Sequence, residues 1–375
     1  MPNPGLTVEQ CREAEQALRD NDGNITKAAD SLGLPRNTYS NRLRRAQLAG
    51  VTADIVIPDG MMVKGVSTLY RDGEVALEWV KTSADAERQK EMFREAVEEM
   101  CEALPKLPPR PSLEADLNDN LMSVIPFGDP HFGMYAWCEE TGEDFDTDIA
   151  KRDLCAAVDY LVSLSPASKR CVIINLGDFF HADNLSGTTS RSGNVLDMDT
   201  RLPRVIRIGV SAMRQAIETA LTKHETVEVI NVIGNHDDVL SMALSIMLAN
   251  IYESEPRIVI HDAPTRRHYI QHGSVLIGAT HGDRTKDRDL PGIMAAEKAV
   301  EWGQTRHRYF YRGHEHHSAY DEYHGCVVEQ FRTLAPSDAW HSAGGYMSGR
   351  DMRLIVHHKD YGEMSRSVCS IDMLR

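Results

Sequence analysis

Five short clusters of histidine, aspartate and asparagine recur between residues 128 and 316 of this 375-residue sequence, and each follows an apolar stretch. In chain order they are Gly128-Asp129-Pro130-His131, Gly177-Asp178-Phe179-Phe180-His181, Gly234-Asn235-His236-Asp237, His281-Gly282-Asp283 and Gly313-His314-Glu315-His316. Imidazole nitrogens with carboxylate and amide oxygens, and no thiolates, suit Mn²⁺, Fe or Zn²⁺. One such cluster is more often a solvated loop or a packed histidine, but five in order predict a metal centre.

The segments around the clusters alternate between strand and helix patterns. The predicted strands are 122–127, 170–176, 226–233, 274–280 and 306–312, and the predicted helices are 148–164, 203–223, 238–253 and 291–301. This alternation predicts an α/β fold. Ligand sites in such folds lie at the carboxyl ends of strands, so all five clusters can converge on one crevice. Glycines beside the clusters permit the tight bends that this requires.

The set D-x-H, G-D, G-N-H-D, H and G-H-x-H, from Asp129 to His316, resembles the signature of calcineurin-like metallophosphoesterases. The resemblance implies a four-layer α/β/β/α sandwich with mixed sheets. It also implies two divalent metal ions, for which we expect Mn²⁺, with Fe or Zn²⁺ as alternatives. The implied ligands are Asp129, His131 and His316 for one ion and Asn235, His281 and His314 for the other, with Asp178 bridging.

His236 lies outside the implied ligand set and would face the leaving group as general acid. Two cations about 3.5–4 Å apart lower the pKa of a bridging water from 15.7 towards roughly 7. The resulting hydroxide would attack phosphorus in line. Proton transfer by His236 would contribute about 10²–10⁴-fold in rate.

His181 follows Asp178 by three residues, where break-repair nucleases of the same superfamily also carry a histidine near the scissile phosphate. It is therefore a second catalytic candidate. The alternative is a histidine that only orients a metal ligand. Asp237, Asp283, Glu315 and His317 flank ligands and are expected to support them or face solvent. The stretch 183–201 is a candidate substrate loop, and the candidate arginines for phosphate contact are Arg191, Arg201, Arg204 and Arg207.

The first fifty residues predict a compact helical unit with helices at 7–20, 25–32 and 36–48. Gly33 closes the second helix, and Ala28-Ala29 allows two helices to approach closely. Residues 23–46 resemble the Fis-type helix-turn-helix, in which the last helix enters the major groove of DNA. That helix carries four arginines and no acidic residue. The implied DNA-contacting residues are Arg36, Asn37, Thr38, Tyr39, Asn41, Arg42, Arg44 and Arg45. The alternative is a module that only docks onto the enzyme or dimerises.

The next seventy residues predict a connecting region. Residues 67–71 and 75–80 flank Asp72-Gly73 and predict a β-hairpin. Thr82 and Asp85 offer a capping box for a helix reaching about residue 104, and a proline-rich linker follows. We therefore expect a helix-turn-helix module at 1–50, a hairpin, helix and linker at 51–120, and a catalytic domain at 121–375.

Composition limits the setting of the protein. Seven cysteines without C-x-x-C spacing indicate reduced thiols. Residues 1–5 have neither the basic start nor the apolar core of a signal peptide, and no stretch is long enough to span a membrane. These features favour a cytoplasmic protein with no membrane partner. The sequence is also compatible with a homo-oligomer. A formal net charge of −15 argues against a general polyanion binder, but bound cations would reverse the local sign at a metal centre.

Three functions are consistent with these features. The first is a DNA-directed nuclease or phosphodiesterase delivered by the N-terminal module. The second is a phosphatase or phosphodiesterase on nucleotides or phosphoproteins, with the module serving regulation or assembly. The third is a DNA-binding regulator with a vestigial enzyme domain, and intact ligands in every cluster argue against it. The whole chain also resembles phosphoesterases of tailed phages and prophages, which implies a role in phage DNA metabolism in the host cytoplasm. Break-repair nucleases carry a capping domain and act with an ATPase, and neither is evident here.

Overall fold

The computed structural model describes residues 8–21, 23–48, 61–71, 74–84, 116–189, 193–338, 342, 344–345 and 347–375. The chain divides into two compact units, 1–96 and 97–375, which are described separately. The three segments predicted at 1–50, 51–120 and 121–375 remain a proposal for the domain boundaries.

Three helices form the beginning of the first unit, as predicted: α1 (Val8–Asp20), α2 (Ile25–Ser31) and α3 (Arg36–Leu48). The side chain of Asn24 caps α2 by accepting hydrogen bonds from the backbone N–H groups of Thr26 (3.1 Å) and Lys27 (3.2 Å). Gly33 follows α2 with a positive φ of 62°. The side chains buried between the helices include Ala14, Ala28, Ala29, Tyr39 and Leu43. Small alanines at this centre let three short helices enclose one core.

A β-hairpin follows in the first unit, made by antiparallel β1 (Met61–Arg71) and β2 (Glu74–Ala84). This confirms the predicted hairpin, although its turn residues lie outside the described part. The prediction that Thr82 caps a helix is wrong, because Thr82 pairs with Val63 inside the hairpin ladder. A β-branched residue suits a strand as well as a cap. The remainder of that predicted helix and the proline-rich linker lie outside the described residues.

The second unit contains a six-stranded sheet of order β13-β12-β3-β4-β5-β6. Its strands are β3 (Asn118–Phe127), β4 (Ser168–Asn175), β5 (Thr226–Asn231), β6 (Ile258–His261), β12 (Asp351–His358) and β13 (Gly362–Ser370). The strands β3 to β6 are parallel, whereas β12 is antiparallel to both β3 and β13.

A five-stranded sheet of order β10-β11-β9-β8-β7 lies against the first. Its strands are β7 (Arg267–His272), β8 (Val275–Thr280), β9 (His307–Arg312), β10 (Ala319–Tyr323) and β11 (Cys326–Gln330). Here β8, β9 and β11 are parallel, and β7 and β10 are antiparallel edge strands. Val124, Ile174 and Ile230 of the first sheet meet Ile277 and Tyr311 of the second in a shared apolar core.

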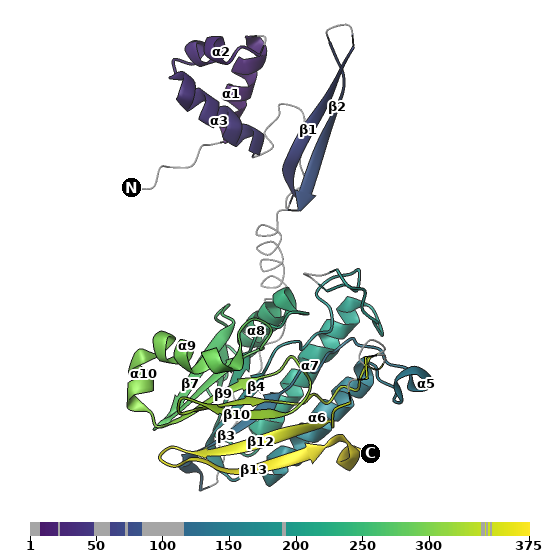
Figure 1. Cartoon of the computed structure of the whole chain (residues 1–375), viewed down its shortest axis with the longest axis vertical. Helices are drawn as coiled ribbons and strands as arrows, with labels where there is room; N and C mark the ends of the chain where they lie inside the picture. Colours follow the sequence, from purple (N-terminus) through teal and green to yellow (C-terminus); the bar gives the residue numbers. More distant parts are fainter. Residues whose placement is uncertain are drawn as a thin grey trace. The chain divides into compact units, whose positions relative to one another are not determined.

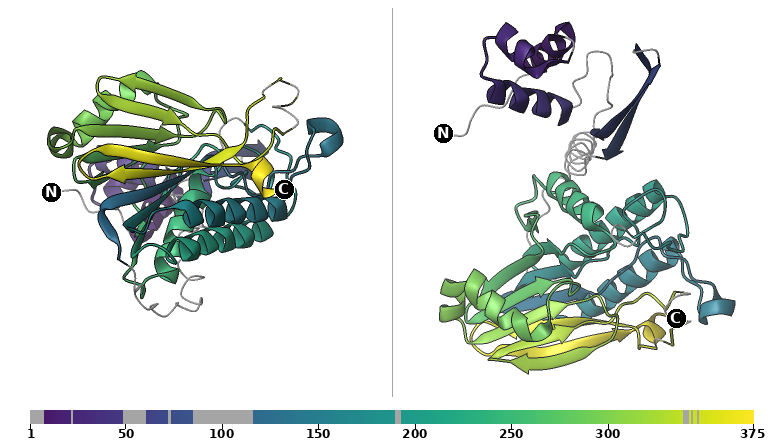
Figure 2. Two further views of the ribbon diagram at one scale, coloured as in Figure 1. Left: turned by 90° about the horizontal axis from the view of Figure 1, so that it is seen from below. Right: turned by 45° about the horizontal axis from the view of Figure 1, so that its top comes forward.

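Helices cover the outer faces of both sheets (Figures 1 and 2). Among the described residues of the second unit, the helical segments are α5 (Cys138–Thr141), α6 (Thr147–Leu164), α7 (Leu202–Ala220), α8 (Asp238–Ile251), η1 (Asp287–Asp289), α9 (Leu290–Glu297), α10 (Ala299–Gln304) and η2 (Ile371–Leu374). The left view of Figure 2 shows α6 and α7 beneath the six-stranded sheet, with the second sheet above it. Leu290 and Met294 of α9 pack on Phe310 at the other side of the five-stranded sheet.

The four-layer α/β/β/α sandwich with mixed sheets is therefore confirmed, together with the helical N-terminal module. The five predicted strands correspond to β3, β4, β5, β8 and β9. The predicted helix at 291–301 is two helices, because the backbone at Lys298 (φ −127°, ψ 49°) is not helical. Within the described ranges, no helix combines the length and the apolar character needed to cross a membrane.

Candidate metal centre

All five predicted clusters follow strands whose carboxyl ends lie at the same side of the sandwich. Three of these strands, β3, β4 and β5, belong to the six-stranded sheet, and two, β8 and β9, belong to the five-stranded sheet. The strands within each set are parallel to their neighbours in this set. The clusters therefore meet where two stacked sheets end together, not along one open sheet.

A first group of candidate ligands consists of Asp129, His131 and His316, whose ligand atoms all lie within 4.8 Å of one another. The Nε2 atoms of His131 and His316 are 3.1 Å apart. Asp129 and His131 are buried, and His316 is half-buried. These are the three residues predicted to hold one metal ion.

A second group consists of Asp178, His281 and His314, again with ligand atoms within 4.8 Å of one another. His281 Nε2 lies 3.1 Å from Asp178 Oδ2, 3.2 Å from His314 Nδ1 and 2.9 Å from Asn235 Oδ1. The other ring nitrogen, Nδ1, donates a hydrogen bond to the carbonyl oxygen of Leu176 at 2.9 Å. This bond leaves Nε2 to face the cluster, as is usual for a metal-binding histidine.

The two groups adjoin, since His281 Nδ1 lies 3.6 Å from Asp129 Oδ1. The structure thus brings together all seven predicted ligands. Their metal-binding roles remain a proposal, developed below.

The backbone at five of these residues is left-handed. Among the described residues, six non-glycine residues have positive φ, and five of them are Asp129 (43°), His131 (48°), Asp178 (49°), His314 (79°) and His316 (56°). Such a conformation costs on the order of 1–3 kcal/mol and gathers at functional sites. Here it aims the side chains inward from sharp bends.

Hydrogen bonds hold these bends in place. The carboxylate of Asp129 accepts from the backbone N–H of His314 at 2.9 and 3.1 Å, and Thr333 Oγ1 donates to the carbonyl oxygen of Asp129 at 2.7 Å. Thr333 was not expected from the sequence, because nothing in its surroundings marks it. The two sheets are thereby linked directly at the candidate ligands.

Asp237 connects two other bends. It is fully buried, and its carboxylate accepts from the backbone N–H groups of Asp178 (3.2 Å), Gly234 (3.2 Å) and Phe180 (3.1 Å). Of the two expectations for Asp237, support of a ligand and exposure to solvent, burial leaves the first. Its position directly after Asn235-His236 is the sequence signal that marked it.

His236 is half-buried and fixed at two points. Its backbone N–H donates to Asp178 Oδ1 at 2.8 Å, and its ring Nδ1 donates to the carbonyl oxygen of His181 at 2.9 Å. The rings of His236 and His131 have centroids 5.2 Å apart. These bonds leave Nε2 as the ring nitrogen of His236 that is free of the backbone.

His181 is buried, and its Nδ1 lies 3.2 Å from Nδ1 of His131. The opposite ring nitrogen of His131 faces His316. His181 therefore contacts the side of His131 remote from His316, which favours an orienting role over contact with substrate. The ligand atoms of His131, His181 and His236 also lie within 4.8 Å of one another.

The ionisation of the cluster fits a cation site. Burial lowers the pKa of His131, and His316 lowers it further, so the ring is neutral as a ligand must be. Burial raises the pKa of Asp129 to about 7, although His281 opposes this shift. Burial would lower the pKa of His281, but Asp178 and Asp129 raise it to about 10. A proton on His281 balances the carboxylates here, and a divalent cation would replace that proton.

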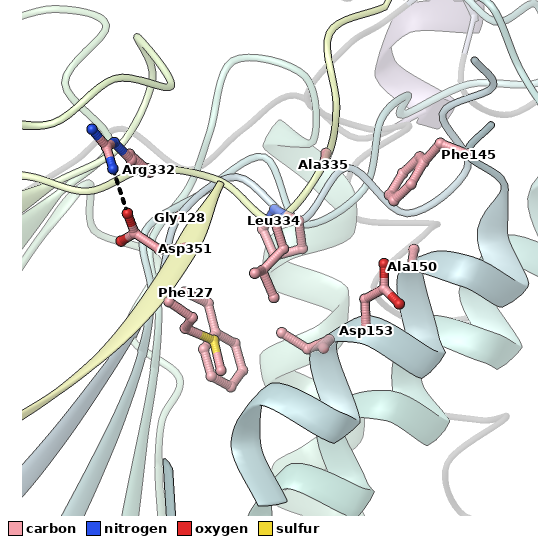
Figure 3. Close-up of a pocket in the computed structure, with 12 residues that line it drawn as sticks. Phe127, Gly128, Phe145, Ala150, Asp153, Arg332, Leu334, Ala335 and Asp351 are labelled. Carbon is pink, nitrogen blue, oxygen red and sulfur yellow. Dashed lines mark hydrogen bonds and ion pairs between the residues drawn. The ribbon is translucent and has the colours of Figure 1, made fainter. Parts of the chain in front are cut away.

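Two pockets elsewhere in the second unit are not lined by these ligands. The pocket in Figure 3 lies between the end of β3 and α6, with Phe127 and Asp153 on its walls, and has a volume of about 10 Å³. This is room for about one water molecule. A larger groove of about 570 Å³ lies at the opposite end of β9, between Arg306, Tyr320 and Arg366. Neither accounts for the candidate metal centre.

The predicted DNA-contacting residues lie on α3, and most of them are accessible. The side chains of Arg36, Asn37, Thr38 and Asn41 are exposed and that of Arg42 is half-buried. Tyr39 is a correction: its side chain is fully buried, and its hydroxyl donates to the carbonyl oxygen of Ala14 at 2.7 Å. It fills the core of the module and cannot reach a base edge. The side chains of Arg44 and Arg45 lie outside the described part.

Residues 11–45 match the family model of the bacterial regulatory protein, Fis family. This match covers α1 to α3 except their outer ends and confirms the predicted Fis-type module. No curated protein matches the chain.

Several solved structures are similar to the chain. One is a conserved uncharacterized protein from Streptococcus pneumoniae TIGR4, described as a predicted phosphoesterase, with a TM-score of 0.32, 13% identity, and coverage of 67% of this chain and 91% of that one. Vps29 from Chaetomium thermophilum gives a TM-score of 0.32, 13% identity, and coverage of 66% and 98%. An archaeal phosphodiesterase gives a TM-score of 0.33, 13% identity, and coverage of 66% and 99%.

Proposed function

We propose that the chain is a two-metal-ion phosphoester hydrolase that acts on DNA as a nuclease or phosphodiesterase. The observation that carries the proposal is the meeting of seven nitrogen and oxygen ligands in two adjoining groups. Within each group, the ligand atoms of the histidines and carboxylates lie within 4.8 Å of one another. Asn235 completes the second group through its contact with His281. Two divalent cations, Mn²⁺ by preference, when bound would supply a water of lowered pKa and positive charge for the phosphoryl oxygens.

The chain's own residues would orient the reaction. Asp178 receives the N–H of His236 on Oδ1 and faces His281 with Oδ2, so it fixes both sides of the centre. His236 would hold a proton at Nε2 for the leaving oxygen, because its Nδ1 is occupied by the carbonyl oxygen of His181. His181 would keep His131 in its ligand orientation.

The Fis-type module supports DNA as the substrate. The exposed side chains at the start of α3, Arg36, Asn37 and Thr38, combine a cation for phosphate with groups that hydrogen-bond base edges. We therefore propose that α3 binds duplex DNA and that the protein acts in the cytoplasm, that of a bacterial host if a phage encodes the chain.

A hydrolysis assay with the Mn²⁺-loaded full chain tests the proposal. The substrates are single-stranded DNA, duplex DNA, cyclic nucleotides and bis(p-nitrophenyl) phosphate, and Asp178→Ala, prepared in parallel, controls for contaminating nucleases. We expect DNA cleavage that requires Mn²⁺ and is lost in the variant. Hydrolysis of small esters or nucleotides without DNA cleavage would contradict DNA as substrate and support the alternative phosphatase or phosphodiesterase. Inactivity on every substrate would contradict the phosphoesterase assignment.

A further inference from the structure

A short extended segment next to the candidate metal centre carries two exposed aromatic rings. Met134 pairs with Met198 and Ala136 with Phe145 in isolated antiparallel bridges. Met134 and Ala136 are buried, whereas Tyr135 is 45% and Trp137 is 48% exposed. In extended backbone, alternate side chains point to the same side, about 7 Å apart. Tyr135 and Trp137 therefore project together from one face of a segment that is anchored by its other face.

This segment continues directly from a candidate ligand. The backbone N–H of Met134 donates to the carbonyl oxygen of His131 at 3.0 Å, and that of His131 donates to the carbonyl oxygen of Asp178 at 3.0 Å. Tyr135 follows His131 by four residues, so its backbone is at most about 14 Å away. The aromatic pair is thus fixed to the metal centre and not carried on a separate loop.

Arg201 closely follows residues 197–199, which are hydrogen-bonded to the segment that carries Tyr135 and Trp137. The N–H of Tyr135 donates to the carbonyl oxygen of Asp197 (2.9 Å), and the N–H of Asp199 donates to that of Gly133 (2.9 Å). Arg201 comes two residues later, is exposed, and forms no ion pair with any residue that the structure describes. A free guanidinium here is available to a phosphate group, unlike Arg204, which is paired with Asp148 at 2.7 Å.

The acidic residues after Trp137 limit where a polyanion can lie. Glu143 pairs with two arginines, Asp144 accepts from the backbone N–H of Cys138 (2.7 Å), and Asp146 caps α6 through Ile149 (2.7 Å). Glu139 and Glu140 in α5 remain exposed. Their charge repels phosphates from the α5 side. Asp197, whose backbone carbonyl oxygen accepts from Tyr135, is exposed as well, so Arg201 is the cation that has to hold a phosphate beside the rings.

We propose that Tyr135 and Trp137 form a stacking platform for the bases of single-stranded nucleic acid, with Arg201 on its phosphates. Every base has a face that can stack on an aromatic ring, and such stacking is tolerant of sequence. Duplex bases are already stacked inside the helix, so the platform selects an unpaired strand or an extruded nucleotide. This inference rests on the proposed function and specifies its substrate at the metal centre.

The test compares Tyr135→Ala/Trp137→Ala with Tyr135→Phe/Trp137→Phe, which retains flat rings, and with Tyr361→Ala, which removes an exposed ring between β12 and β13. Binding of a short oligothymidylate to the metal-free full chain is followed by fluorescence anisotropy. As a separate readout, the emission of Trp137 alone is obtained by subtracting the emission of Trp137→Phe from that of the wild type. Each ring that the alanine pair removes should weaken oligonucleotide binding about fivefold to 150-fold. The phenylalanine pair and Tyr361→Ala should bind as wild type does.

Hydrolysis of bis(p-nitrophenyl) phosphate by the Mn²⁺-loaded alanine pair separates this inference from the proposed function. We expect that activity to stay at the wild-type level. Unchanged oligonucleotide binding with normal ester hydrolysis would overturn the platform and leave the phosphoesterase intact. A change of Trp137 emission with protein concentration alone would show that a second copy covers the rings, and would also overturn the platform. If the wild type itself does not hydrolyse the ester, the proposed function is contradicted instead.

Discussion

His131 and His316 are 185 residues apart in the chain, yet their Nε2 atoms lie 3.1 Å from each other. Both residues have left-handed backbone, with φ of 48° and 56°. Two neutral imidazoles with lone pairs facing each other repel, so this contact needs a proton or a cation between them. Strained backbone that aims two such nitrogens at one point is what a preformed cation site requires.

Gly313→Ala should disturb the centre without unfolding the protein. A Cβ atom at Gly313 would lie 2.5 Å from Asp129 Oδ2, so the carboxylate must move. We expect weaker Mn²⁺ binding by isothermal titration calorimetry and at least a tenfold loss of activity. Gly303→Ala is the matched control, because a Cβ there meets nothing within 4 Å. Since Gly303 is in α10, its replacement should stabilise the fold by about 0.5–1 kcal/mol. Equal Mn²⁺ affinity in both variants would argue against Asp129 as a ligand.

His236→Ala should separate metal binding from turnover. The ring of His236 is oriented by the carbonyl oxygen of His181, and the proposed role is proton transfer to the leaving group. We expect near-normal metal content by atomic absorption and a loss of about 10²–10⁴-fold in kcat. Asp178→Ala should lose both metal and turnover. Full activity of metal-loaded His236→Ala would remove this histidine from the mechanism.

Tyr39→Phe should affect stability and leave DNA recognition intact. The Tyr39 hydroxyl is buried and donates to the carbonyl oxygen of Ala14. Its loss removes one of two hydrogen bonds to that oxygen, which also accepts within α1, at a cost of about 0.5–1.5 kcal/mol to the module. Thermal unfolding followed by circular dichroism should show a lower transition for the module. Arg36→Ala should instead keep this transition temperature and weaken the binding of duplex DNA, measured by a mobility-shift assay. Weakened DNA binding by folded Tyr39→Phe would contradict the placement of this ring.

His357 should make the fold sensitive to mild acid. Burial lowers the pKa of His357 to about 3, and its Nε2 lies 2.9 Å from the Tyr311 hydroxyl in the core between the sheets. Below the ordinary pKa near 6.5, the unfolded chain binds a proton that the folded chain refuses, so stability falls as the pH falls from about 6.5 towards about 3. Two pH units below the ordinary value this costs about 3 kcal/mol.

His357→Gln cannot take up that proton, so its urea midpoint should fall less than that of the wild type between about pH 7 and about pH 4.5. The two proteins are compared by the change of each midpoint, because the substitution itself alters stability at neutral pH. Parallel loss of stability in both would assign the acid sensitivity to other groups.

The features that the sequence predicted well are local. Asn24 caps α2 and Gly33 ends it through contacts within a few residues, so the three helices of the module follow from their own segments. The strands before Asp129, Asp178 and Asn235 are likewise apolar runs that end at a glycine. Thr82 was misassigned because a capping pattern and a strand pattern overlap there, and pairing with Val63 decides between them.

The sequence by itself determined which side chains could bind metal and that each follows a strand. Only the tertiary structure decided that β8 and β9 belong to a second sheet, which brings His281 and His314 to face Asp178. It also decided that Tyr39 points into the core and that His181 lies behind His131. The physical reason is that these relationships join residues far apart in the chain. Their geometry depends on how sheets stack and which helix face is covered, and neither is encoded by the spacing of nearby residues.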